Sequence, residues 1–396
     1  MRAALLALTL MSGLLAASPA MAARWTSDDL VTLRQWVAAA PNEGLPELPV
    51  RPLSRAVAAG AEAQIDEAAD ALALELARMH LLGAATSGER AGWNIVDPDR
   101  DIDLAPMLDH AVGNGSLGSF LAGLRPVHPD YAILRRALAT ETDLDRRTAI
   151  VRNMERWRWM PRDPGADYLI VNAPAFEARL WRGGKPVGAW RVIVGKTSTP
   201  TPIFGATVTG VNINPWWYIP ASIVRESIGA LVRRSPATAR ARGYVWGNGS
   251  YRQRPGPNNA LGVVKLVMPN NYRVYLHDTP NKALFDEQVR TFSHGCIRVS
   301  DALGLATTLL DGRMTRDEID AIVATRKTTT VDLPRGLPIY VTYFTAFADG
   351  DGSVRVVPDI YRRDTRIRAS ADMRPPVRMA ETTVGEGCPV PANAAG

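Results

Sequence analysis

The stretch that decides the fold is DYLIVNAPAFEARLWRGGKPVGAWRVIVG, residues 167–195. Short runs rich in β-branched and aromatic residues follow one another, and the turn signal Arg182-Gly183-Gly184-Lys185 stands between two of them. This pattern predicts short strands joined by a tight turn. Similar runs return in VKLVMP, YRVYLHD and LPIYVTYFTAF, so we expect a mixed, mainly β domain over residues 148–368.

The chain before this domain has helical periodicity. In QIDEAADALALELARMHLL apolar side chains recur at helical spacing, and Gly83 follows as a stop signal. We expect an all-helical scaffold domain over residues 23–147. An Arg-rich, helix-like insertion and a Gly/Pro/Asn loop interrupt the β runs at about residues 222–260, a length typical of a helical capping subdomain. The predicted fold class is therefore α+β.

The two ends of the chain read differently from its middle. MRAALLALTLMSGLLAASPAMA, residues 1–22, has a basic start, an apolar run and a small-x-small cleavage site, which predicts a secretory signal peptide. A membrane anchor would need about 20 apolar residues, and this run ends at Pro19. No later run is apolar enough to span a membrane. We expect export to the periplasm, and a disordered tail over residues 369–396 because it is rich in Gly, Pro and Ala.

The charge balance is modestly basic. The net charge is +6 and the isoelectric point about 9.5. Such an excess favours acidic wall polymers or membrane surfaces, but the basic residues are scattered and no nucleic-acid motif is present. We interpret the charge mainly as a contribution to solubility and expect no nucleic-acid partner.

One of the two cysteines lies in a structured-looking stretch. Cys296 stands in TFSHGCIRVS, residues 291–300, whereas Cys388 stands in the predicted tail. Exported proteins normally pair their cysteines, and a bridge between these two would tie a core to a tail. An unpaired thiol in an oxidising compartment therefore indicates a chemical role.

A nucleophilic thiol needs a base beside it and donors for the oxyanion. His277 ends the apolar run VYLHD, and the connection of Asp278 to Phe292 is long enough to return the chain beside it. Gly295 lacks a Cβ, so the backbone there can adopt a positive φ, and the amides of Gly295 and Cys296 could face one oxyanion. Arg298, two residues after the thiol, offers a fork of donors to a carboxylate.

Two other interpretations of Cys296 stay open at this point. It could be an inert buried cysteine, although its Ser-His-Gly neighbours are polar for a core strand. It could also join His277, Asp278 and His294 as a zinc ligand, because these residue types bind zinc. Their spacing differs from that of compact zinc modules. We favour the nucleophile and expect no metal and no cofactor.

His277, a connection of fifteen residues and then Ser293-His294-Gly295-Cys296 resemble the signature of the L,D-transpeptidases with a YkuD-type catalytic domain. NMERWRWMPRD, NPWWYIPASI and GPNNALGVVKLVMPN are similar to the larger YcbB-like branch, although this chain lacks room for a separate peptidoglycan-binding repeat before RWRW. The resemblance covers about residues 148–368.

The resemblance implies an enzyme that forms a cysteinyl thioester with a peptidoglycan tetrapeptide stem and transfers it to an acceptor stem, giving a 3→3 cross-link. It implies Cys296 as nucleophile and His277 as base. Hydrolysis of the same thioester by an L,D-carboxypeptidase or endopeptidase, and tethering of a protein lysine, stay open, as does the role of Asp278. Carbapenem-type inhibitors are expected to acylate the thiol. The candidates for oxyanion or site-shaping residues are Ser293, His294 and Gly295. The candidates for substrate-binding residues are Arg298, Trp217 and Tyr275.

Overall fold

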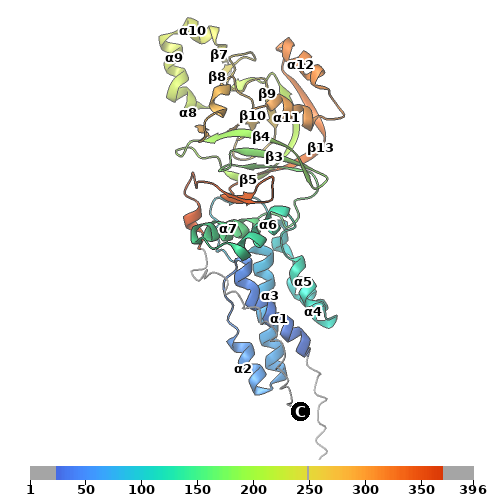
Figure 1. The fold of residues 1–396 in the computed structure, drawn as a ribbon. Helices are drawn as coiled ribbons and strands as arrows, with labels where there is room; N and C mark the ends of the chain where they lie inside the picture. Colours follow the sequence, from blue (N-terminus) through green and yellow to red (C-terminus); the bar gives the residue numbers. More distant parts are fainter. Residues whose placement is uncertain (1–23, 248, 369–396) are drawn as a thin grey trace, which may run out of the picture.

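The computed structural model describes residues 24–247 and 249–368. From bottom to top in Figure 1, the molecule consists of a helical region, a β domain and a cap. The predicted signal peptide, the predicted tail and Cys388 lie outside the described residues. Within the described ranges, no helix combines the length and the apolar character that crossing a bilayer requires. The fold is mixed α+β, as the sequence predicts.

The helical region begins with strong local signals. Thr26 caps the first helix in a capping box with Asp29, and Gly83 ends the longest helix. Leucines from five helices, among them Leu33, Leu76 and Leu121, are fully buried in one core. The helices are α1 (Ser27–Ala39), α2 (Arg51–Ala59), α3 (Glu62–Leu82), α4 (Leu104–Gly113), α5 (Leu117–Gly123), α6 (Pro129–Thr140) and α7 (Leu144–Trp157), with 3₁₀ turns at Ala40–Glu43 and Pro98–Asp101.

Helices α6 and α7 belong to the β domain as much as to the scaffold. Leu134, Ile150 and Met154 are fully buried in the same hydrophobic cluster as the strands, and Figure 1 shows both helices lying across the base of the β domain. The boundary expected at 147/148 therefore falls inside α7. The reason is that one side of this amphipathic helix packs on the sheet while its start continues the helical region.

The main sheet closes on itself. Its hydrogen-bonded order is β5-β13-β2-β3-β4-β12-β10-β9, and β9 also pairs with β5. Gly183 and Gly184, both at positive φ, form the predicted turn between β3 and β4. The strands are β1 (Trp93–Asn94, beside β5), β2 (Tyr168–Asn172), β3 (Glu177–Arg182), β4 (Lys185–Gly195), β5 (Ile203–Ile213), β9 (Val264–Val267), β10 (Leu276–His277), β11 (Thr291–Ser293, beside β4), β12 (Ile297–Val299) and β13 (Thr329–Thr342).

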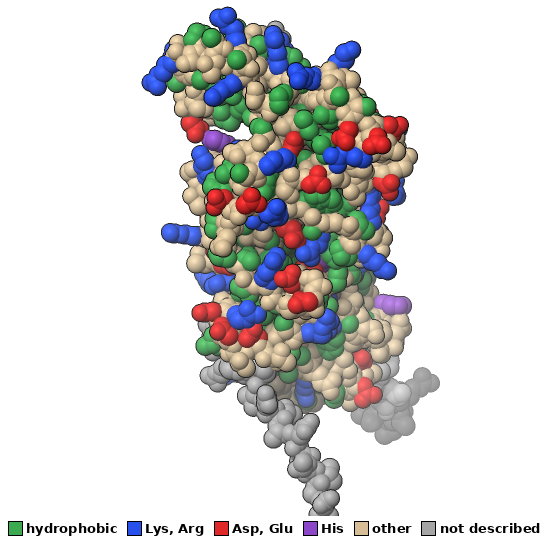
Figure 2. Space-filling model, turned by 45° about the horizontal axis from the view of Figure 1, so that its top comes forward, with side chains coloured by type: hydrophobic (Ala, Val, Ile, Leu, Met, Phe, Trp, Pro, Cys, Tyr) green, Lys and Arg blue, Asp and Glu red, His purple; other side chains and the backbone are tan. Residues whose placement is uncertain are grey.

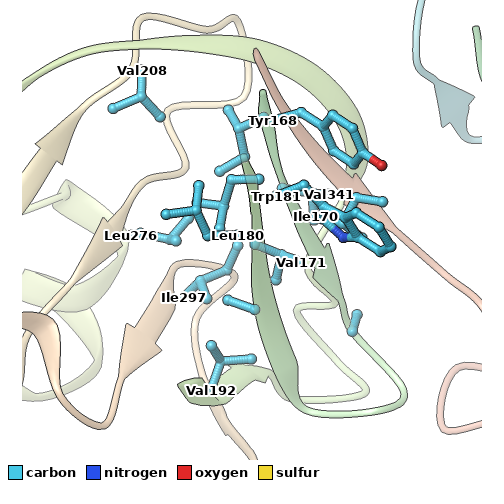
Figure 3. Close-up of a cluster of buried hydrophobic side chains, with 14 of the residues drawn as sticks. Tyr168, Ile170, Val171, Leu180, Trp181, Val192, Val208, Leu276, Ile297 and Val341 are labelled. Carbon is cyan, nitrogen blue, oxygen red and sulfur yellow. The ribbon is translucent and has the colours of Figure 1, made fainter. Parts of the chain in front are cut away.

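The interior of the closed sheet holds the hydrophobic core of the β domain. Figure 3 shows Val171, Leu180, Leu276 and Ile297 pointing into it from neighbouring strands. Helix α11 (Ala302–Leu309) adds buried side chains, while α12 (Arg316–Thr325) buries Ile319. Beyond the sheet lie the hairpin β14 (Ala346–Ala348) and β15 (Val354–Val356) and 3₁₀ turns at Lys282–Phe285 and Asp364–Arg366.

The cap, residues 217–260, contains the expected helices and also a small antiparallel sheet. Part of the stretch expected as a loop forms the hairpin β7–β8, with Val245 opposite Arg252 and Trp246 opposite Tyr251; Tyr, Val and Trp are residue types that favour strands. The cap elements are β6 (Trp217–Tyr218), α8 (Ala221–Ile223), a π-helical turn (Val224–Ile228), α9 (Gly229–Arg234), α10 (Pro236–Ala241), β7 (Tyr244–Gly247) and β8 (Ser250–Gln253).

Candidate active site

The pairing of β10 with β12 brings the predicted base and nucleophile to one face of the sheet. The strands are parallel, with Leu276 opposite Ile297 and His277 opposite Arg298. Since Leu276 and Ile297 point into the core (Figure 3), their strand neighbours point to the other face. His277 and Cys296 are then diagonal neighbours, with backbones about 8 Å apart from standard strand spacings. An imidazole can span much of that separation.

His277 is oriented by a backbone carbonyl. Its ring is buried, and Nδ1 lies 2.5 Å from the carbonyl oxygen of Asp278. A carbonyl only accepts, so Nδ1 carries the proton and Nε2 keeps a free lone pair. Burial and then the positive charge of Arg298 lower the pKa of His277 to about 4, against the opposing effects of the Asp278 carbonyl, the Asp278 negative charge and the Leu261 carbonyl. The ring is therefore neutral at pH 7 and able to accept a proton.

The carboxylate of Asp278 faces away from that imidazole. Its Oδ2 accepts the Val263 amide at 2.9 Å, and its Oδ1 forms an ion pair with Lys282 at 2.5 Å. A Cβ on Gly262, which has φ +62°, would lie 2.2 Å from Oδ2. Asp278 thus orients the base through its carbonyl oxygen, while its side chain fixes the loop before β9.

Cys296 is a free, partly buried thiol in a positively charged setting. Burial raises the pKa of the Cys296 thiol, while the Tyr275 amide, Arg298 and Lys265 lower it. Its Sγ lies 4.0 Å from the Arg273 carbonyl oxygen. Over the described ranges, no hydrogen bond joins Sγ to the His277 ring. The resting pair is therefore a neutral thiol and a neutral imidazole, and Arg298 and Lys265 stabilise the thiolate when it forms.

The Ser-His-Gly turn before the thiol is fixed by internal hydrogen bonds. Ser293 Oγ donates to the Cys296 carbonyl at 2.5 Å and accepts the Gly295 amide at 3.1 Å. Gly295 has φ +107°, where other residues are strained. The sequence predicts that the Gly295 amide faces an oxyanion. In the structure this amide instead donates its hydrogen bond to Ser293 Oγ. Among the described residues no acceptor pairs with the Cys296 amide, so this amide is the motif donor available to an oxyanion.

A loop after β4 supports the motif from behind. Thr201 Oγ1 donates to the Gly295 carbonyl and accepts the Gly195 amide, both at 2.9 Å. Thr199 Oγ1 donates to the Ser293 carbonyl at 3.3 Å. Thr201 is 1 % exposed, so water cannot replace these bonds. Nothing in the sequence indicates Thr199 or Thr201 as candidate site residues, because their contacts with the motif join positions 94 residues apart.

The remaining predicted residues lie at different distances from the pair. Tyr275 lies opposite Cys296 in the extended register, and its ring centroid is 6.2 Å from that of His277. Burial and the Cys296 thiol raise the pKa of Tyr275 to about 12. His294 turns to the cap, where its Nε2 lies 2.8 Å from Glu226 Oε2. Trp217 lies in β6 opposite Gln253, in the cap sheet.

Lys265 and Glu226 are site residues that the sequence analysis missed. Lys265 is opposite His277 in the antiparallel pair of β9 and β10, and its Nζ lies 4.7 Å from the Tyr275 ring. Its signal was present, because Val264 and Leu266 face the core and the residue between them must face the other way. Glu226 had no comparable signal.

The zinc arrangement considered from the sequence is not assembled. Asp278 and His294 turn to Lys282 and Glu226, away from the thiol. Within residues 24–247 and 249–368, no group of three or more His, Cys, Asp or Glu side chains is placed to hold a metal ion. The geometry is that of a thiol, an oriented imidazole and two cations, which suits nucleophilic attack on a carbonyl.

Two family models match separate parts of the chain. Residues 166–327 match the L,D-transpeptidase catalytic domain (YkuD), and residues 20–138 match a Scaffold domain. A protein of Haemophilus influenzae described as a putative L,D-transpeptidase is 28 % identical over 284 residues, covering 65 % of this chain and 57 % of that protein. The chain thus spans little more than half the length of this relative.

Solved structures give a weaker likeness. The Ldtfm–avibactam carbamoyl enzyme is 14 % identical with a TM-score of 0.26, covering 46 % of this chain and 51 % of that one. An L,D-transpeptidase from Mycobacterium smegmatis is 15 % identical with a TM-score of 0.24, covering 45 % and 58 %.

Proposed function

We propose that this chain, which carries an L,D-transpeptidase catalytic domain after a scaffold domain, is an exported enzyme that forms 3→3 cross-links between peptidoglycan stem peptides through a thioester on Cys296. The observation that carries the proposal is the β10–β12 register, which puts His277 and Cys296 on one polar face of the sheet. The neutral, oriented ring of His277 supplies the base that such a thiol requires.

In the first half-reaction Sγ of Cys296 attacks the carbonyl carbon that joins the third and fourth residues of a donor stem. Nε2 of His277 takes the thiol proton as the C–S bond forms. The Cys296 amide donates to the developing oxyanion, while Arg298 and Lys265 stabilise negative charge on sulfur. The C–N bond then breaks, and the terminal D-alanine leaves with the proton that His277 held.

In the second half-reaction an amine of an acceptor stem attacks the thioester carbonyl. His277 accepts one proton from that amine and returns it to the leaving sulfur, so an amide forms and the free thiol is restored. Arg298 forms no salt bridge within the described residues and is partly buried beside the thiol. Its fork of donors is suited to a stem carboxylate.

The compartment and the inhibitors follow from the same chemistry. The signal-peptide pattern of residues 1–22 supports a periplasmic location, where peptidoglycan stems are available. A carbapenem-type β-lactam presents a strained amide carbonyl to the same sulfur. Its ring opening on Cys296 would leave an acyl group that blocks turnover.

Mass spectrometry of purified tetrapeptide muropeptides incubated with the protein tests this function. Dimers joined through two third-position residues support transpeptidation. Monomers that only lose D-alanine would assign the water-resolved reaction of an L,D-carboxypeptidase, and linkage to an added lysine-bearing protein would assign tethering. Full turnover by a Cys296→Ala variant would contradict every thioester scheme. Full turnover by His277→Gln would contradict the assigned base.

A further inference from the structure

The positive charge of the chain is concentrated on the cap. Residues 217–260 contain seven arginines, one glutamate, and neither lysine nor aspartate. The cap alone therefore has a formal charge of +6, which equals the net charge of all 396 residues. The rest of the chain is formally neutral, so the basic excess that we interpreted as scattered, solubilising charge is in fact a local property.

The cap arginines are exposed and uncompensated. Figure 2 shows Lys and Arg side chains gathered over the top of the molecule, where the cap lies. No salt bridge formed by them is found within residues 24–247 and 249–368, whereas Arg24, Arg78 and Arg316 elsewhere on the surface pair with carboxylates. Grouped like charges repel one another and create a positive potential that attracts a polyanion. The exposed cap arginines are Arg225, Arg233, Arg234, Arg240, Arg242 and Arg254.

Exposed aromatic side chains accompany these arginines. Tyr218 is 65 % exposed and Trp246 is 62 % exposed. Trp246 lies opposite Tyr251 in the β7–β8 pair, and the two rings meet edge to face at 4.7 Å. This contact fixes the orientation of Trp246 while leaving much of the ring open. An open aromatic ring can pack against the apolar face of a sugar.

The cap also contacts the catalytic motif. Glu226, on the π-helical turn of the cap, bonds His294 at 2.8 Å, and His294 is two residues from the thiol. A ligand held along the cap would therefore lie beside the site where the acyl group forms. Arginines also attract anionic membranes, but this position favours the polymer that carries the substrate.

We propose that the cap surface, defined by the six exposed arginines with Tyr218 and Trp246, binds the peptidoglycan strand. Guanidinium groups contact the carboxylates of the stem peptides, and Trp246 packs on a sugar ring. The identity of the polymer rests on the proposed function above.

Co-sedimentation with purified sacculi tests this surface. The protein is the full chain with Cys296→Ala, so that binding is measured without turnover and a failed cross-linking assay leaves the result intact. The cap variant R233Q/R234Q/R240Q is compared with R34Q/R51Q/R55Q, which removes the same charge from exposed positions on α1 and α2. Thermal unfolding of both variants checks that they fold.

The cap variant is expected to raise the apparent Kd for sacculi about tenfold, since three exposed ion pairs with the polymer are lost. The control variant is expected to bind like the parent. Raising the salt concentration should weaken the parent more than the cap variant, and Trp246→Ala should reduce the binding that survives at high salt. Equal losses in both triple variants would overturn the proposal. So would unchanged sacculus binding with lost binding to phosphatidylglycerol vesicles, which would assign the cap to a membrane surface.

Discussion

Replacing Arg298 with Gln should raise the pKa of the Cys296 thiol. Arg298 lies directly opposite His277 on the neighbouring strand, and its charge lowers the pKa values of both His277 and the Cys296 thiol. Arg298 and Cys296 are two residues apart on one side of the extended chain, which separates their side chains by about 7 Å. At an effective dielectric constant of about 20, Coulomb's law gives roughly 2.4 kcal/mol, or somewhat less than two pH units, as an upper figure for the thiol. Solvent at this partly exposed site reduces it to about one pH unit.

The assay is the rate of iodoacetamide alkylation of Cys296 as a function of pH. Only the thiolate reacts, so the midpoint of the profile follows the thiol. Removing the guanidinium removes a stabiliser of the thiolate, and the midpoint should move up by about one pH unit. Arg335→Gln is the matched control, because Arg335 is 85 % exposed on β13. A midpoint that stays in place, or moves down, in Arg298→Gln would refute the electrostatic account of the site.

Other regions of the molecule give further predictions. Among the described residues, neither ring nitrogen of His80 has a hydrogen-bond partner, and burial lowers the pKa of His80 to about 3. Below about pH 6.5 the unfolded chain therefore binds more protons than the folded chain, and the stability of the folded protein falls as the pH is lowered towards 3. Urea unfolding measures the free energy of unfolding at pH 7.5 and at pH 5. Its decrease between these two pH values should be about 2 kcal/mol smaller in His80→Leu than in the parent, and an equal decrease would contradict this. Thr201→Val leaves the Gly195 amide and the Gly295 carbonyl unpaired and should lower the free energy of unfolding by roughly 2–4 kcal/mol. Thr201→Ser keeps the hydroxyl and should lower it by about 1 kcal/mol. Equal effects of the two variants in thermal or urea unfolding would argue against a role for these hydrogen bonds. Glu226→Ala removes the contact between the cap and His294 and should speed amide hydrogen exchange over residues 221–241 about two- to fivefold. Ser227→Ala is the control, and unchanged exchange in Glu226→Ala would contradict this prediction.

The parts of the fold that could be predicted are those with local signals. The turn at Gly183-Gly184 and the strands on either side follow from residue type and alternation. His277 and Cys296 could be proposed together because the connection between them is long enough to reverse the chain. Their common face could not be assigned, because it depends on the parallel register of β10 and β12, which is set by packing of Leu276 and Ile297.

Contacts between distant segments account for what the sequence did not indicate. Thr201 supports Gly295 across 94 positions, and Glu226 reaches His294 across 68. No periodicity or composition marks either residue. The sequence predicts that the Gly295 amide faces the oxyanion, but this amide donates to Ser293 Oγ, and which acceptor a backbone amide selects depends on the folded turn. The cap hairpin was missed because the glycines between Trp246 and Ser250 are typical of a loop in the sequence.

Acid-quenched mass spectrometry of the protein with a tetrapeptide stem determines whether Cys296 carries the acyl group. We predict an adduct with the mass of the stem minus D-alanine on the peptide that contains Cys296, absent in Cys296→Ala and strongly reduced in His277→Gln. An adduct on another residue, or cross-linked product without any adduct on Cys296 at early times, would show that Cys296 is not the nucleophile.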